Sequence, residues 1–275
     1  HRLPQNYLIL ELSPSLRQLQ RETLAASVPQ LLPRVAWLQD LPEYGFRGVV
    51  IGNELLDAMP VQRFRRWRGG WQELSVAGDA GGMHDHWTSI RSPGLARALA
   101  ALWADDASVA EGYSSELNLR LAPWLRAVAE RMQRGYLLLI DYGYSRDEYY
   151  HPQRSQGTLI CHFRHRAHAD PYLLPGLQDI TANVDFSALA TAGSDAGFSL
   201  AGFTTQAHFL IDSGLQALLV ASDPADIKRH LQRMQGVKKL TLPSEMGERF
   251  KVMALAMDAP PVLSGFRSRD LRGRL

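Results

Sequence analysis

The chain alternates short, almost continuous apolar runs with amphipathic stretches. The apolar runs lie at residues 7–12, 34–38, 48–52, 136–140 and 250–257. Such runs are typical of strands that are buried on both faces of a sheet. The stretches between several of them carry apolar residues every three or four positions, which predicts helices. Strands that alternate with helices favour an α/β fold with a mostly parallel sheet.

Local signals predict where the helices lie. Ser13 is a good N-cap and Pro14 suits a first helical turn, so a helix is predicted from there to about residue 27. A long amphipathic helix is predicted from Leu117 to near Gly135. Further helices are expected around residues 95–103, 215–220 and 227–234, and a further strand over residues 203–211.

Other segments depart from this alternation. Strand-like residues 61–64 and 71–76 flank a glycine turn and predict a hairpin, whereas residues 78–87 predict a loop. Residues 144–186 show little regular pattern, and the arginine-rich end of the chain is expected to be frayed. We therefore expect a core from residues 1–60 and 136–258, a hairpin and helical insertion over 61–135, a substrate-side loop region over 144–186 and a tail over 259–275.

Composition narrows the class of protein. A chain of 275 residues with 45% hydrophobic and 21% charged residues fits one large globular domain. The single cysteine, Cys161, excludes an intrachain disulfide, which favours a reducing compartment, and we expect a cytoplasmic protein. No apolar run approaches the length of a membrane helix, and the arginines at residues 63–68 are balanced by 28 acidic residues, so neither a membrane nor a nucleic-acid partner is expected.

Polar residues follow the apolar runs at one predicted edge of the sheet. They are Glu11, Asp40, Asn53, Glu54 and Asp141. In an open parallel sheet, ligands bind beyond the carboxyl ends of the strands. Glu11 could accept two ribose hydroxyls or be an ordinary surface residue. Glu54 and Asp57 could hold a guanidinium, although Asp57 could equally cap the following turn.

Histidines cluster in the irregular region. His162, His165 and His168 follow Cys161 at a spacing that differs from common zinc motifs, so hydrogen-bonding or substrate-facing histidines are favoured over a metal site. Sequence motifs of the common serine hydrolases, P-loop enzymes and zincins are absent. The residues alone leave the reaction open.

The chain resembles the MidA-like family of class I S-adenosylmethionine-dependent methyltransferases. The segments that carry the resemblance lie in order at residues 11–20, 52–61, 139–144, 149–152, 157–159, 164–168, 175–181, 184–186 and 243–251. The resemblance implies a Rossmann-like methyltransferase sheet with a hairpin and helical insertion and an antiparallel last strand. It also implies S-adenosylmethionine as the methyl donor.

The resemblance also implies residue roles. Donor binding is expected from Glu11, Ser13, Trp37, Leu38, Asp40 and Asn53. Catalysis is expected from Asn53, Glu54 and Asp57. The acceptor side is expected to involve Asp141, Tyr142, Arg164, His165, Asp179 and Asp185. No metal is expected.

Two departures from the family matter for function. The family's first strand and glycine-rich loop are expected to be missing from these residues, which are therefore expected to bind the donor weakly or not at all. Asn183 stands where the family commonly has histidine. The resemblance implies a protein arginine N-methyltransferase, with a respiratory-complex subunit as one acceptor, and leaves a homodimer open. The alternative is a methyltransferase-fold assembly or scaffold protein without turnover.

Overall fold

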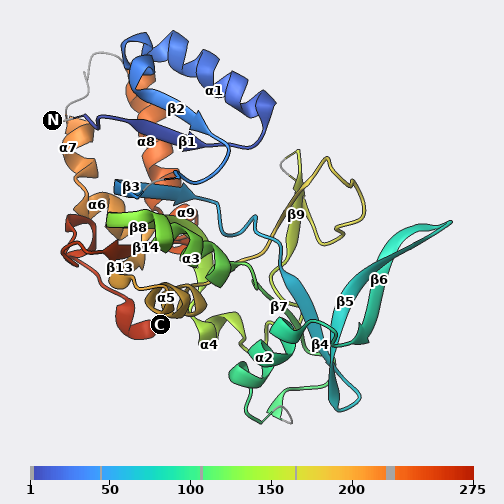
Figure 1. Cartoon of the computed structure of the whole chain (residues 1–275). Helices are drawn as coiled ribbons and strands as arrows, with labels where there is room; N and C mark the ends of the chain where they lie inside the picture. The colour runs from blue at the N-terminus through green and yellow to red at the C-terminus, as the bar shows by residue number, and fades with distance from the viewer. Residues whose placement is uncertain (1–2, 44, 106–107, 165, 221–226) are drawn as a thin grey trace.

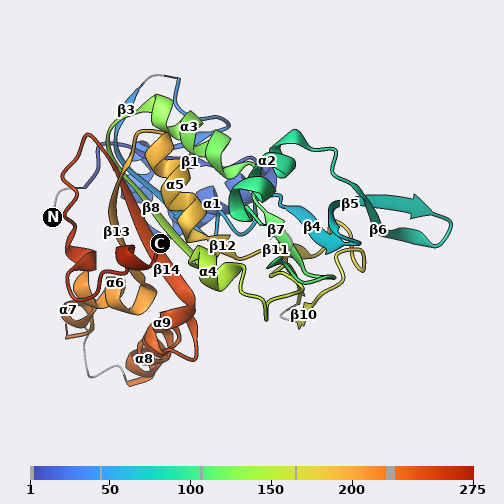
Figure 2. The same ribbon diagram turned by 90° about the horizontal axis from the view of Figure 1, so that it is seen from below.

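The computed structural model describes residues 3–43, 45–105, 108–164, 166–220 and 227–275. Its centre is a five-stranded sheet covered by helices (Figure 1, Figure 2). The strands are β3 (Phe46–Asn53), β8 (Met132–Tyr144), β12 (Val184–Asp185), β13 (Ser199–Thr205) and β14 (Phe250–Met257). β3 and β12 are parallel to β8, whereas β14 is antiparallel to both β8 and β13. The predicted α/β fold with an antiparallel last strand is confirmed.

The middle of strand β8, residues 136–140, is apolar, and hydrophobic clusters cover both of its faces. Leu137 and Leu139 are fully buried in one cluster, beside helices α3 (Leu121–Arg131) and α5 (Phe186–Asp195). Leu138 and Ile140 pack against the other cluster. Successive side chains of a strand point to opposite faces, so this double cover requires the unbroken apolar run seen in the sequence.

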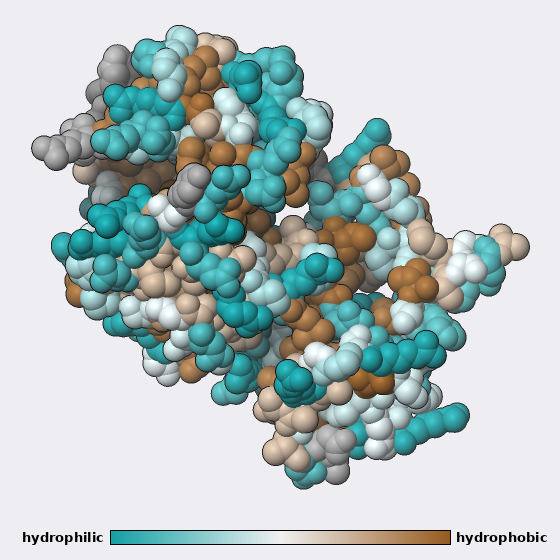
Figure 3. All heavy atoms as spheres, viewed as in Figure 1, coloured by the Kyte–Doolittle hydropathy of each residue, from teal (hydrophilic) through white to brown (hydrophobic). Residues whose placement is uncertain are grey.

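Strands β1 (Tyr7–Leu10) and β2 (Val35–Leu38) form a separate parallel pair. They lie above β3 in Figure 1, and their carboxyl ends point the same way as that of β3. Within the described residues no strand pairing joins β1 to β3. Leu8, Leu10, Val49 and Ile51 remain 47–63% exposed, and Figure 3 shows hydrophobic side chains where this upper lobe meets the body. The family's first strand, which the resemblance implies, would fit between β1 and β3, and its absence from these residues stays a prediction.

Helix α1 (Pro14–Ser27) follows β1 and begins as the sequence predicts. The Ser13 hydroxyl accepts the backbone N–H of Leu16 at 3.3 Å, and Pro14 occupies the first helical position. A 3-10 helix, η1 (Pro29–Arg34), leads into β2. The strand–helix–strand unit is therefore confirmed.

The insertion is an antiparallel sheet that projects from the core (Figure 2). Its order is β6-β5-β4-β7, from β4 (Gln62–Trp67), β5 (Gly70–Asp79), β6 (Gly82–Ser89) and β7 (Ser114–Leu117), with helix α2 (Pro93–Leu102) beside it. The loop predicted at residues 78–87 is wrong, because β5 and β6 continue as one long hairpin. Most of β6 is exposed, so it lacks the alternation of apolar and polar residues that marks a half-buried strand.

The predicted helix over residues 117–135 is shorter in the structure. Residues before Leu121 belong to β7 and a turn in which Asn118 accepts the N–H of Arg120, and residues from Met132 onward belong to β8. Helix α3 packs in the core cluster of the central sheet. The insertion expected over residues 61–135 thus includes α3 and the start of β8, which pack in the core of the central sheet, and its bounds stay a prediction.

Residues 144–186 contain more regular structure than the sequence suggests. Helix α4 (Arg146–Tyr149) precedes a small antiparallel sheet of order β10-β9-β11, from β9 (Ile160–Phe163), β10 (Arg166–His168) and β11 (Asp179–Thr181). These strands have three or four residues, too few to show a hydrophobic period. Figure 1 shows β9 between the central sheet and the insertion.

The C-terminal part differs from the prediction in two places. β13 ends at Thr205, and helix α6 (Gln206–Asp212) occupies the rest of the predicted strand, because a short apolar run does not distinguish helix from strand. Three more helices follow: α7 (Leu215–Val220), α8 (Ile227–Thr241) and α9 (Met246–Arg249). None of the helices in the described ranges could cross a bilayer.

The C-terminal tail is packed rather than frayed. It contains two 3-10 helices, η3 (Ser264–Phe266) and η4 (Arg272–Arg274). Phe266 is 8% exposed and contacts the ring of Phe209 at 5.4 Å. The N–H of Leu271 donates to the carbonyl of Phe203 at 2.7 Å. The tail therefore covers β13.

Candidate functional site

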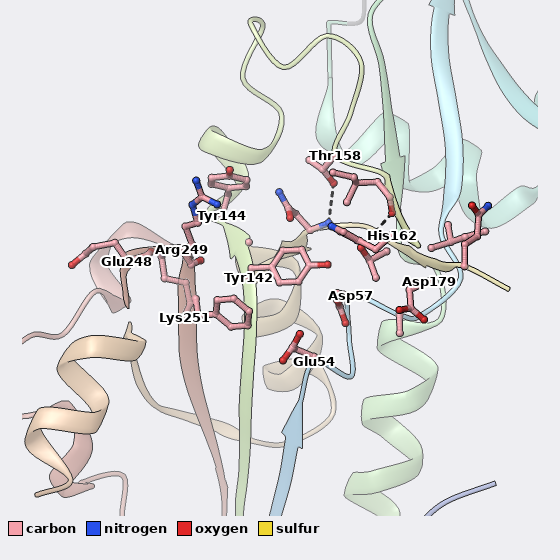
Figure 4. Close-up of a pocket in the computed structure, with 18 of the residues that line it drawn as sticks. Glu54, Asp57, Tyr142, Tyr144, Thr158, His162, Asp179, Glu248, Arg249 and Lys251 are labelled. Carbon is pink, nitrogen blue, oxygen red and sulfur yellow. Dashed lines mark hydrogen bonds between the residues drawn. The ribbon is translucent and has the colours of Figure 1, made fainter. Parts of the chain in front are cut away.

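A cavity of about 1400 Å³ opens at the carboxyl ends of β3 and β8. The loop after β3 supplies Glu54 and Asp57, and β8 supplies Tyr142 (Figure 4). The opposite walls come from the β10-β9-β11 sheet and from the start of β14. The cavity therefore lies where the sequence predicted a ligand, at the carboxyl edge of the parallel strands.

The end of β3 turns sharply at Glu54. This residue has φ +48°, in the left-handed region that a non-glycine residue adopts at a cost of about 1 kcal/mol or more. The Asn53 side-chain amide donates to Glu54 Oε1 at 3.0 Å, and the Glu54 N–H donates to the carbonyl of Ile140 at 2.9 Å. The two predicted catalytic side chains are therefore held together at the tip of the strand.

Asp141 lies fully buried beneath this loop. Its Oδ2 accepts the backbone N–H of Leu56 at 2.9 Å and that of Asp57 at 3.3 Å, and its Oδ1 accepts the N–H of Tyr142. Burial, together with the negative charge of Asp57, raises the pKa of Asp141 to about 7. Asp141 does not line the cavity; it holds the loop that carries Glu54 and Asp57, and its predicted part on the acceptor side stays a prediction.

Asp57 is the buried carboxylate of the cavity wall. It is 4% exposed, and its Oδ1 has no hydrogen-bond partner in the described structure. Tyr142 lies beside it. Burial raises the pKa of Tyr142, a hydrogen bond with Thr181 opposes the rise, and a hydrogen bond with Asp57 and the negative charges of Asp57 and Asp141 reinforce it. Tyr142 is therefore a neutral hydroxyl at neutral pH. A buried carboxylate oxygen without a partner is costly, and a cationic ligand would remove that cost.

Thr158 joins the cavity to the insertion sheet. Its N–H and hydroxyl donate to Glu116 Oε1 at 2.6 and 2.5 Å, while its hydroxyl oxygen accepts the N–H of Asn183 at 2.9 Å. Glu116, on β7, also accepts the Tyr149 hydroxyl at 3.1 Å. Burial raises the pKa of Glu116, and the hydrogen bonds from Thr158 and Tyr149 oppose that rise. Glu116 therefore fixes the wall formed by Thr158 and Asn183.

The predicted donor-binding residues lie at or after the ends of β1 and β2, and Asn53 at the end of β3, all outside the cavity lining. Glu11 Oε1 accepts the N–H of Ser13 at 2.9 Å, and Oε2 accepts the side-chain amide of Gln20 at 3.3 Å. Gln20 in turn accepts the indole N–H of Trp37 at 2.9 Å, which ties Glu11 to Trp37. Each carboxylate oxygen keeps a second acceptor position, so the chemistry of Glu11 fits a ribose diol. Leu38 and Asp40 follow on the same edge.

The other predicted acceptor residues divide into two groups. Arg164 and Asp179 line the cavity. Asp185 does not; its Oδ1 caps α5 by accepting the N–H of Ala188 at 2.9 Å, and its predicted part on the acceptor side stays a prediction. His165 lies outside the described residues. Within them, no group of three or more His, Cys, Asp or Glu side chains is arranged to hold a metal ion.

Several lining residues had no role in the sequence-based prediction. They are Thr158, Gln178, Lys239, Glu248, Arg249 and Lys251. The segments 157–159 and 243–251 carry the family resemblance, and that was the available signal for most of them. Glu116 had no such signal, because its role comes from contacts with residues more than 30 positions away.

Comparison with known proteins identifies the family. The family model of an S-adenosyl-L-methionine-dependent methyltransferase matches residues 2–204. The chain is 29% identical to the protein arginine methyltransferase NDUFAF7 of Danio rerio over 280 residues, which cover 90% of this chain and 60% of the relative. It is 30% identical to the protein of the same name from Bos taurus, covering 80% of this chain and 48% of the relative. The chain thus spans about half to three fifths of these relatives.

A solved structure agrees in fold and sequence. The crystal structure of a COG1565 superfamily member from Burkholderia thailandensis, bound to S-adenosyl-homocysteine, superposes with a TM-score of 0.91 at 43% identity. The match covers 98% of this chain and 69% of that one. The predicted cytoplasmic location is contradicted, because these curated relatives are named as mitochondrial proteins.

Proposed function

The chain belongs to the family of S-adenosyl-L-methionine-dependent methyltransferases, and from this premise we propose that it methylates a guanidinium nitrogen of an arginine in a protein. The observation that carries the proposal is the buried Asp57 carboxylate, whose Oδ1 has no partner in the described structure and which lines the cavity beside Glu54. The names of the curated relatives point to the same acceptor. The family resemblance further implies that the acceptor protein is a subunit of a respiratory complex. That this chain forms a homodimer stays a prediction.

Two carboxylates and a tyrosine suit a guanidinium. A guanidinium has five N–H donors in a plane and binds carboxylates through two parallel hydrogen bonds. Glu54 and Asp57 would supply acceptors, and the Tyr142 hydroxyl would bound the site on the third side (Figure 4). A lysine ammonium would need fewer acceptors and no planar arrangement. The carboxylate pair therefore favours arginine.

The donor would be held at the ends of β1, β2 and β3. The Glu11 carboxylate would bind the ribose, Ser13, Trp37, Leu38 and Asp40 would border the base, and Asn53 would lie beside the methyl-bearing end. S-adenosylmethionine, when bound, supplies a methyl group on a positively charged sulfur. A strand that pairs with the free edges of β1 and β3 would complete this site, and the exposed Leu10 and Ile51 between them support that proposal.

The residues of this chain would act by alignment and charge. Glu54 and Asp57 would hold the guanidinium so that one nitrogen faces the methyl carbon, which converts an encounter into an oriented reaction. They would also localise the positive charge on the other nitrogens. Asp57 Oδ1 is the atom available to take the proton that the attacking nitrogen releases. Tyr142 and Thr158 would keep water from the reacting nitrogen.

Methyl transfer from radiolabelled S-adenosylmethionine tests the proposal. The protein from its complete gene, its Glu54→Gln variant and the exposed-site control Asp195→Asn are incubated with lysate of cells that lack the gene. The proposal predicts labelled protein with the wild type and the control, and a loss of about 100-fold or more with Glu54→Gln. Equal labelling by all three samples would favour a scaffold without turnover.

A further inference from the structure

We propose that the acceptor is an extended protein segment in which an acidic side chain lies about three residues from the methylated arginine and pairs with Arg249 and Lys239. This inference rests on the proposed function and concerns the part of the cavity that the reacting guanidinium does not use. Figure 4 shows the two parts on opposite sides of Tyr142, with Asp57 and Asp179 on one side and Arg249 and Lys251 on the other.

The cavity is too large for one arginine side chain. Its volume of about 1400 Å³ exceeds the roughly 300–1000 Å³ of ordinary small-molecule pockets. A second hollow, of about 560 Å³, shares Tyr144 with it and continues past Arg154, whose guanidinium lies 4.0 Å above the Tyr144 ring. The cavity and the second hollow together are therefore large enough for several residues of a peptide chain.

At the far end of the cavity the basic side chains Lys239 and Arg249 outnumber the one acidic side chain, Glu248. Arg249 and Lys239 are exposed, line the cavity, and make no ion pair or side-chain hydrogen bond within the described ranges. Glu248 lies among them, but its Oε1 already accepts the Arg269 guanidinium at 2.9 Å. Both cations stand in the last turn of a helix, where positive charge is favourable, yet that does not explain why both face one cavity.

The donor does not account for this positive end. The strand order runs from β3 through β8 to β14, and the predicted donor residues lie beyond β3. Phe250 pairs with Tyr142, so Arg249 lies on the opposite side of β8 from Glu54. A carboxylate that pairs with Arg249 therefore has to come from the acceptor.

The sheet sets the spacing. Neighbouring strands are about 4.8 Å apart, so two steps from β3 to β14 correspond to about 10 Å. An extended chain rises about 3.3 Å per residue, which makes this distance about three residues. Tyr142 and Phe250, with rings 5.4 Å apart, would form the floor under the intervening residues. An arginine over the loop that follows β3 would therefore place a residue about three positions away over the start of β14, next to Arg249.

Synthetic peptides test this arrangement. Thirteen-residue peptides carry one central arginine in an alanine, glycine and serine background, with a single glutamate moved from five positions before the arginine to five after it. Glutamine at each position is the matched control. With the protein from its complete gene, a glutamate about three residues away on one side should lower KM about fivefold or more relative to glutamine. The kcat should change less than twofold.

A charge reversal identifies the pairing residues. The double variant Arg249→Glu, Lys239→Glu should lose the preference for glutamate and favour lysine at the same position, with an unchanged Kd for S-adenosylmethionine. Arg233→Glu, on an exposed part of α8 outside the cavity lining, should keep the wild-type preference. Three results would overturn the proposal. They are equal KM values for all glutamate positions, a double variant that still prefers glutamate, and a shift in the donor Kd of the double variant. If the wild type methylates neither a peptide of the set nor a protein in lysate, the proposed function itself fails.

Discussion

The Asp141 carboxylate accepts the backbone N–H of Leu56 at 2.9 Å, although the two residues are 85 positions apart in the chain. This bond and that from the Asp57 N–H tie the loop after β3 to β8. The loop then presents Glu54 and Asp57 to the cavity. The geometry of the proposed site therefore depends on a buried group that does not line the cavity.

Asp141 makes stability depend on pH. Its pKa is raised from 3.8 in the unfolded chain to about 7 in the fold, so the folded state binds a proton more tightly. The stabilisation is complete below pH 4 and is lost as pH rises to 7, with a slope of up to about 1.4 kcal/mol per pH unit. In Asp141→Asn this contribution should disappear. Urea unfolding of both proteins between pH 4 and 8 measures it, and parallel stability curves would contradict the account.

Asp57→Asn should lower methyl transfer by about 100-fold or more at saturating donor, because the buried oxygen that would receive the guanidinium proton is replaced by an amide. Donor affinity should stay within twofold, since Asp57 lies on the acceptor side. Rate assays and calorimetric titration of S-adenosylmethionine separate the two effects. Asp195→Asn, an exposed carboxylate on α5, is the matched control, and equal losses in both variants would argue against a role for Asp57.

Glu11→Gln should weaken binding of S-adenosylmethionine about tenfold or more, because an amide offers one acceptor oxygen where the carboxylate offers two. Isothermal titration of the protein from its complete gene measures the Kd. Glu22→Gln, on the exposed face of α1, removes a carboxylate from the same helical unit and should leave the Kd unchanged. An unchanged Kd in Glu11→Gln would remove the ribose role.

Glu116→Gln should raise the KM for the acceptor while the donor Kd stays the same. The amide of the variant carries two N–H donors where the carboxyl oxygens of Glu116 accept from Thr158 and Tyr149, so the Thr158–Asn183 wall of the cavity should loosen. Loss of a buried hydrogen bond also costs about 1–3 kcal/mol of stability. A variant that is destabilised with normal acceptor KM would make Glu116 a purely structural residue.

Phe266→Ala should lower the free energy of unfolding by about 3–5 kcal/mol, because the ring fills the space above β13. A β-carbon on Gly202 would lie 2.4 Å from that ring, so the two positions are in close contact. Denaturant unfolding measures the change. A loss below about 1 kcal/mol would mean that the tail is frayed, as the sequence suggested.

The sequence predicted those helices and strands whose buried positions give a recognisable pattern of apolar residues. β8 and β14 are apolar on both faces, and Ser13 and Pro14 mark the start of α1, so these elements were found. The β5–β6 hairpin has little burial, and the strands of residues 160–181 are three or four residues long, so neither has a readable period.

The sequence predicted those site residues that directly follow a strand, because the end of a parallel strand fixes the edge of the sheet at which they lie. Asn53 and Glu54 follow β3, and the parallel pairing with β8 brings them to Tyr142 and above Asp141. The sequence could not show that Asp141 turns inward, or that Asp185 caps a helix, because both depend on which backbone N–H groups lie nearby. It also could not show that Arg249 and Lys239 face the same cavity, because this depends on how α8 and α9 pack against the sheet.

The central claim is that Glu54 and Asp57 hold an arginine guanidinium at the carboxyl edge of the sheet. Amino-acid analysis after acid hydrolysis of protein labelled with tritiated S-adenosylmethionine tests it directly. The account predicts that the label elutes as methylarginine and disappears in Asp57→Asn. Label in methyl-lysine or another amino acid, or methylarginine formed equally by the variant, would contradict it.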